Sequence, residues 1–189
     1  MLSTGHLSVD INSGSLPAIL PFFVSEYGMD YTSIAGLMFA SSFLSSVIQP
    51  LFGWLADKGS RQWFMGLGVL MTGLSLALTG FVTDYWSIFA AVTIMGIGSS
   101  IFHPEGARNV NAIAGTRKGQ GMSIFSVGGN AGFGFGPLLA VFLITTFGMK
   151  GTAFYGFTAI IMSSLLFLAA PSIRRAAEAS RIASQQDRP

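Results

Sequence analysis

The chain has 189 residues with a formal net charge of +2, of which 51% are hydrophobic and only 10% charged, and its mean hydropathy is +0.61. These values depart from those of soluble domains and indicate a membrane protein with long apolar segments separated by short polar connections. The absence of cysteine excludes disulfide frameworks, thiol nucleophiles and cysteine metal sites.

Six apolar stretches of about 20 residues follow one another along the chain, each long enough to cross a hydrocarbon core about 30 Å thick as a helix. Short connections rich in Gly, Asp and Ser separate them. A transmembrane β-barrel would show much shorter alternating segments. The sequence therefore predicts an all-α membrane domain over residues 1–171, with spans at 3–24, 33–55, 62–82, 86–107, 121–147 and 153–171, followed by a basic tail at 172–189.

The basic residues predict the orientation of these spans, because Lys and Arg near span ends favour the cytoplasmic side. Nine of the ten lie on one side of the predicted map, leaving Lys150 on the other. We therefore expect both termini in the cytoplasm. The nine are Lys58, Arg61, Arg108, Arg117, Lys118, Arg174, Arg175, Arg181 and Arg188.

Two ionisable residues lie inside the first predicted span. His6 and Asp10 are four residues apart, so they share one face of a helix. Charged groups are costly in hydrocarbon, which makes such residues candidates for function. Asp10 is the leading candidate for proton coupling or substrate contact, since an acid near mid-membrane has few structural roles.

The fourth predicted span contains His103, Glu105 and Arg108. Pro104 disturbs a helix, so the first two either serve the same cavity as Asp10 or cap the backbone of a broken helix end. Arg108 either binds an anionic substrate or is an interfacial positive-inside residue. Asn130, in the fifth span, is a candidate polar contact in a cavity or between helices.

The connection GWLADKGSRQW, between the second and third spans, concentrates charge in an apolar chain. Taken alone, it is typical of a tight cytoplasmic turn, in which Asp57 bonds to N–H groups of a neighbouring helix or pairs with Arg61. Its Gly-x-Leu-Ala-Asp-Lys-x-x-Arg pattern resembles the signature loop of the major facilitator superfamily. The resemblance implies a gating loop of Gly53, Asp57, Lys58 and Arg61.

The fifth span contains GGNAGFGFGPLLA, which resembles the glycine-rich motif of the antiporter branch of that superfamily. Gly128, Gly132 and Gly136 recur every four residues, so they share a face that permits close helix packing. Pro137 should bend this helix where a neighbour can cover the freed carbonyl. Simple packing is the alternative to a functional role.

IFHPEGARNV, SIFSVGGNAG and the opening HLSVD resemble the fosmidomycin-resistance branch of the superfamily. The resemblance covers the N-terminal six of the family's twelve helices and implies two inverted three-helix repeats. It also implies proton-coupled efflux of a small drug-like or anionic molecule by alternating access. The expected partners are the substrate, protons and lipid, with either a second copy of the chain or a missing C-terminal half; the tail would then begin an interdomain linker.

Two other classes of function stay open. A noncatalytic six-helix folding or assembly unit would fold without carrying flux. A membrane-embedded enzyme is disfavoured because no Gly-x-Ser-x-Gly or His-x-x-x-His pattern occurs. His6, Asp10, His103 and Glu105 have no metal-binding spacing, so we expect neither a metal nor a cofactor, and no nucleic-acid partner.

Overall fold

The computed structural model describes residues 1–58 and 61–186, and these residues are almost entirely helical. The predicted all-α fold with six helices is confirmed. Gly59 and Ser60 of the charged connection, and Arg188 of the tail, lie outside the described residues. The helices are α1 (Leu2–Tyr27), α2 (Tyr31–Lys58), α3 (Trp63–Leu78), α4 (Tyr85–Ala114), α5 (Lys118–Phe147) and α6 (Ala153–Gln186), with a short 3-10 helix, η1 (Met149–Thr152), before α6.

Five of the described helices are long and apolar enough to cross a membrane, and α3 is an apolar helix of only 16 residues. At 1.5 Å per residue, α3 is about 24 Å long. The predicted span at 62–82 was therefore too long at its C-terminal end. The backbone N–H groups of Thr79, Gly80 and Phe81 bond three residues back, which tightens the chain into a turn. Gly80 also abuts the Met149 carbonyl of η1, where a side chain would clash.

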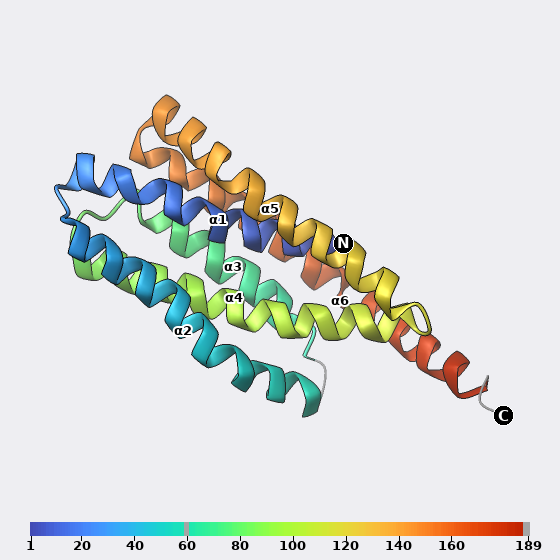
Figure 1. The fold of residues 1–189 in the computed structure, drawn as a ribbon. Helices are drawn as coiled ribbons and strands as arrows, with labels where there is room; N and C mark the ends of the chain where they lie inside the picture. Colours follow the sequence, from blue (N-terminus) through green and yellow to red (C-terminus); the bar gives the residue numbers. More distant parts are fainter. Residues whose placement is uncertain (59–60, 187–189) are drawn as a thin grey trace.

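The helices run alternately up and down the bundle, so that the start of α1, the ends of α2 and α6, and the α4–α5 connection lie toward one end (Figure 1). Helix α1 packs along α5, α4 packs along α2, and α3 packs against both α4 and α6. If α1 exchanges places with α4, α2 with α5 and α3 with α6, the packed pair α1–α5 becomes the packed pair α4–α2. This is the arrangement expected of two inverted three-helix repeats.

Two helices extend beyond their predicted ends. Helix α4 continues to Ala114, where residue 107 was predicted, and α6 continues through Pro171 to Gln186. The residues after 171 are therefore helical as far as residue 186. Their sequence, SIRRAAEASRIASQQ, lacks Gly and Pro and is rich in Ala, Arg and Glu, which favour helices.

Aspartates precede two helices at the end of the bundle opposite the termini. The Asp30 carboxylate accepts from the backbone N–H of Ser33 at 2.8 Å, and the Asp84 carboxylate accepts from that of Ser87 at 2.9 Å. Hydrogen bonding from Ser33 and Ser87 holds the pKa of each carboxyl below its usual value. Both acids therefore fix helix starts, a role that needs no substrate.

Candidate functional site

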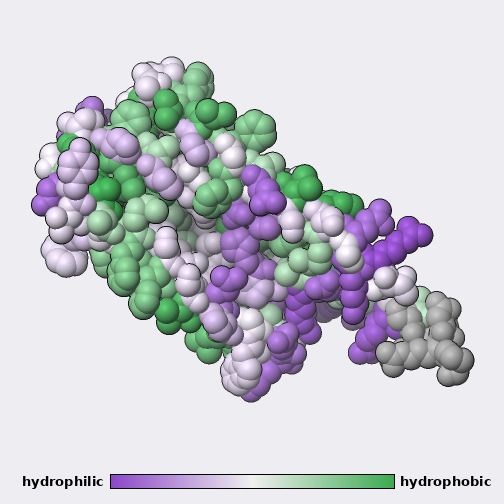
Figure 2. Space-filling view, viewed as in Figure 1, coloured by the Kyte–Doolittle hydropathy of each residue, from purple (hydrophilic) through white to green (hydrophobic). Residues whose placement is uncertain are grey.

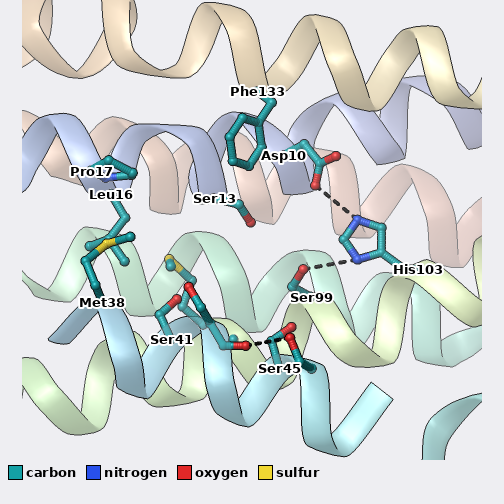
Figure 3. Close-up of a pocket in the computed structure, with 14 residues that line it drawn as sticks. Asp10, Ser13, Leu16, Pro17, Met38, Ser41, Ser45, Ser99, His103 and Phe133 are labelled. Atoms are coloured by element: carbon teal, nitrogen blue, oxygen red, sulfur yellow. Dashed lines mark hydrogen bonds and ion pairs between the residues drawn. The ribbon is translucent and has the colours of Figure 1, made fainter. Parts of the chain in front are cut away.

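A cavity of about 340 Å³ lies between α1, α2 and α4, with Phe133 of α5 at its edge (Figure 3). Its apolar wall includes Leu16, Met38 and Met95. Six hydroxyl groups also line it: those of Ser13, Ser41, Ser42, Ser45, Ser46 and Ser99. Asp10 and His103 are the ionisable residues among its described lining. The cavity thus offers apolar contact and many hydrogen bonds to a small molecule.

Three ionisable side chains meet at one end of this cavity: His6, Asp10 and His103, here named the triad. Asp10 Oδ2 lies 3.1 Å from His6 Nε2, and Asp10 Oδ1 lies 3.0 Å from His103 Nε2. His6 and Asp10 come from one face of α1, whereas His103 comes from α4. The structure therefore brings together the three residues that the sequence singled out at the starts of the two repeats.

The His6 ring is fixed by α5. Its Nδ1 lies 2.8 Å from the backbone carbonyl oxygen of Phe125, and its ring stacks on the Phe125 ring with centroids 4.0 Å apart. Gly129, on the same helix, faces His6 and Asp10 so closely that a Cβ there would lie 2.7 Å from Asp10 Oδ2. His6 is consequently held on the packed side of the triad, away from the cavity.

The His103 ring is fixed within its own helix. Its Nδ1 lies 3.1 Å from Ser99 Oγ, one turn earlier on α4. His103 is also the most exposed member of the triad, with 24% of its side chain accessible, against 14% for Asp10 and 12% for His6. Asp10 and His103 line the cavity directly (Figure 3), so a bound molecule could contact both.

The triad has side chains of the kinds that bind transition metals, and their ligand atoms lie within 4.8 Å of one another. Its two contacts of 3.0 and 3.1 Å are also ordinary hydrogen-bond lengths between nitrogen and oxygen. A proton alone accounts for each of them. We therefore interpret the triad as a proton-binding cluster.

Glu105 does not join the triad. Successive helical residues are rotated by about 100°, so Glu105 points away from His103, two positions earlier. The fully buried Glu105 carboxylate accepts from the Arg61 backbone N–H at 3.1 Å and from Asn109 Nδ2 at 2.8 Å. Helix α4 is continuous through Pro104, so neither residue caps a broken helix end. Glu105 instead connects α4 to the chain entering α3.

Two further candidates lie outside the central cavity. Arg108 lines a separate cavity of about 640 Å³ where α4, α5 and α6 meet, together with Lys118, Arg174 and Arg181. Hydrophilic side chains gather toward this end of the molecule (Figure 2). Asn130 is exposed on α5, two residues from each of two glycines that face α1, and so projects away from α1. The structure does not support a role for either residue in the central cavity.

The charged connection shows contacts of a different kind from those expected. Asp57 is exposed, and no ion pair joins it to Arg61 in the described part of the chain. The Lys58 ammonium lies 3.6 Å from the centroid of the Trp54 ring, a cation–π contact. Gly53 faces α4, where a Cβ would lie 4.0 Å from the Pro104 Cβ. The connection is thus tied to α4 through Gly53 and through the Arg61 backbone.

The glycines of α5 face α1, as their spacing predicts. A Cβ on Gly132 would lie 2.5 Å from the Leu7 carbonyl oxygen, and one on Gly136 would lie 2.6 Å from that of Ile11. Gly128 abuts the Ser3 carbonyl in the same way. Helix α5 continues through Pro137, and Gly14 of α1 packs against the Phe133 carbonyl, the one that Pro137 leaves without its helical donor. This interface positions the triad.

Sequence reasoning missed the serine wall and the Phe125 carbonyl. The serines had a signal, because Ser41, Ser42, Ser45 and Ser46 form two pairs at a spacing of four residues in an apolar helix. The Phe125 carbonyl had none, since every residue carries such a group. Ser99 could have been found from its position four residues before His103.

A bundle of apolar helices around a cavity that contains a carboxylate and an imidazole is the arrangement of a multi-pass membrane protein with a polar site inside its spans. The chain belongs to the Major Facilitator Superfamily, whose family model matches residues 2–188. The chain is 32% identical over 160 residues to the fosmidomycin resistance protein of Escherichia coli (strain K12), covering 85% of this chain and 39% of that protein.

Two other relatives lead to the same class. The chain is 31% identical over 163 residues to the uncharacterized MFS-type transporter YfnC of Bacillus subtilis (strain 168), covering 86% of this chain and 39% of YfnC. It is 26% identical over 140 residues to the multidrug resistance protein MdtG of Yersinia enterocolitica, covering 71% of this chain and 34% of MdtG. The chain therefore spans about two fifths or less of the length of these relatives.

Proposed function

We propose that this chain forms one half of a proton-coupled transporter that expels a small drug-like or anionic molecule by alternating access. The observation that carries this proposal is the Asp10 carboxylate, held within the bundle between two imidazoles at the end of a cavity. A carboxylate that can gain and lose a proton beside a bound molecule provides the link between proton entry and substrate exit. The relative named for fosmidomycin resistance makes that phosphonate drug the first substrate to test.

The connection containing Gly53, Asp57, Lys58 and Arg61 would govern the conformational cycle in this scheme. The Arg61 backbone is bound to the buried Glu105, so movement of this connection pulls directly on α4, which carries His103. The excess of Lys and Arg at the end of the bundle that holds the termini supports a cytoplasmic position for that end in the bacterial inner membrane. The helical extension of α6 after residue 171 would then project into the cytoplasm toward the next unit.

A test of the transport proposal uses the purified chain in liposomes with an acidic lumen. Fosmidomycin should accumulate inside the liposomes while the proton gradient persists, because outward movement of protons drives inward movement of drug in a reversible antiporter. Dissipating the gradient with nigericin should stop accumulation. Equal uptake with and without the gradient would contradict proton coupling, and no uptake by a chain that forms a dimer would favour the noncatalytic six-helix alternative.

We further propose that a second six-helix unit closes the cavity, by rotation about an axis along the membrane normal. Two copies of this chain satisfy that geometry, because the start of α1 and the end of α6 lie at one end of the bundle (Figure 1). Twofold association is also the commonest oligomeric form. Mass measurement in nanodiscs, corrected for lipid, should then show a dimer. A persistent monomer would assign the closing unit to a separate C-terminal half.

A further inference from the structure

We propose that the coupled proton is bound between His6 Nε2 and Asp10 Oδ2, and that His103 forms the side of the triad that faces the substrate. This inference rests on the proposed function and divides the triad into a proton side and a substrate side. It follows from which atoms can donate and which can only accept.

The Phe125 carbonyl fixes the first proton of His6. A backbone carbonyl only accepts hydrogen bonds, so the contact of 2.8 Å requires a proton on His6 Nδ1. In a neutral imidazole the other nitrogen, Nε2, then carries a lone pair. That lone pair would face the Asp10 carboxylate oxygen at 3.1 Å, with an acceptor on both sides and no donor.

A second proton resolves this conflict. With a proton between Nε2 and Oδ2, the contact becomes a charge-assisted hydrogen bond between imidazolium and carboxylate. The stacked Phe125 ring, with its centroid 4.0 Å from that of His6, also favours a cationic imidazole. Gly129 closes the remaining side, where even a Cβ would lie 2.5 Å from His6 Nε2. The proton-loaded state is therefore the one that satisfies both contacts of His6.

The hydrogen bonds of His103 do not require a second proton on its ring. Ser99 lies 3.1 Å from its Nδ1, and a hydroxyl can either donate or accept. A neutral His103 can therefore accept from Ser99 at Nδ1 and donate from Nε2 to Asp10 Oδ1 at 3.0 Å. Both contacts are satisfied without an additional proton, and the ring forms part of the cavity wall.

The surroundings of His6 contain no competing charge among the described residues that pack against it. Asp10 on α1 and His103 on α4 are the ionisable groups that face it. Helix α5 contributes the Phe125 ring and carbonyl, and α4 also contributes the Phe102 ring. Helix α6 reaches this end of α1 with Leu166. Loss of the proton would leave one uncompensated negative charge at Asp10 and weaken the chain of hydrogen bonds from α5 through α1 to α4.

Nitrogen-15 NMR of the wild-type chain in nanodiscs tests this assignment, because the chain contains only two histidines. His6→Gln and His103→Gln assign the two sets of ring signals. Between about pH 5 and about pH 9, on either side of the ordinary imidazole pKa of about 6.5, His6 should change from doubly protonated to the neutral form with its proton on Nδ1. His103 should keep a proton on Nε2, the ring nitrogen that faces Asp10 Oδ1.

Three results would overturn the assignment: titration at His103 in place of His6, a neutral His6 with its proton on Nε2, or no titration of His6 in that range. The NMR measurement needs no flux. The assignment can therefore fail while proton-coupled transport succeeds, and transport can fail while the assignment holds.

A second measurement tests the assignment through binding of the drug. His6→Gln should remove the pH dependence of fosmidomycin binding, whereas His103→Gln should reduce the affinity itself.

Discussion

Asp10→Asn is expected to abolish the dependence of transport on the proton gradient. Asparagine is nearly isosteric with aspartate, and its amide can still accept from His103 Nε2 and donate to His6 Nε2. The triad should therefore stay assembled while losing the carboxylate that shares the coupled proton with His6. In liposomes with an acidic lumen, accumulation of fosmidomycin above the outside concentration should disappear completely, while exchange of labelled for unlabelled drug continues.

Asp84→Asn is the matched control for this substitution. Asp84 precedes α4 at the opposite end of the bundle from the termini, and its carboxylate caps the Ser87 N–H. Asparagine caps helices as well as aspartate does. The control should therefore retain gradient-driven accumulation. Unchanged proton coupling in Asp10→Asn would remove Asp10 from the mechanism.

Gly132→Ala is expected to destabilise the bundle by about 1–3 kcal/mol, the usual cost of overpacking. The added methyl would lie 2.5 Å from the Leu7 carbonyl oxygen and 2.9 Å from the Ile11 nitrogen. These are backbone atoms, which cannot move aside without separating α1 from α5. Since α5 also carries the Phe125 carbonyl, the same change should disturb His6.

Gly134→Ala provides the control on the same helix. Nothing lies within 4 Å of a Cβ at Gly134, so the extra methyl meets no neighbour. Alanine is the better helix former by up to about 1 kcal/mol, which predicts unchanged or slightly raised stability. Thermal unfolding of both variants in detergent gives the comparison. Equal melting temperatures would show that close packing at the glycine face does not stabilise the structure.

The helices and the main polar residue of the site could be predicted from the sequence. A run of apolar residues long enough to span a bilayer leaves few structural alternatives, and Asp10 stands out inside such a run. The exceptions have local causes. Helix α3 ends early because Gly80 meets η1, and the residues after 171 extend α6 because their composition favours a helix.

The assembly of the site could be predicted only in part. The contact between Asp10 and His103 joins residues 93 positions apart, and its partners were suggested by span position rather than by any local pattern. Glu105 was wrongly grouped with His103, although two positions on a helix point in nearly opposite directions. Asn130 was wrongly predicted to face a cavity or another helix. It lies two positions from Gly128 and from Gly132, so it points away from the helix face that packs on α1. The Phe125 carbonyl that orients His6 depends on the packing of α5 against α1, which the sequence pattern only outlines.

A molecule bound in the cavity and a proton bound at the triad should affect each other, because Asp10 belongs to both sites. The most direct measurement is proton exchange on adding fosmidomycin to the purified chain in weakly buffered detergent, followed with a pH indicator. The wild type and Asp84→Asn should release protons, whereas Asp10→Asn should release none. Binding of the drug to the wild type without any change in bound protons, or equal release from Asp10→Asn, would contradict it.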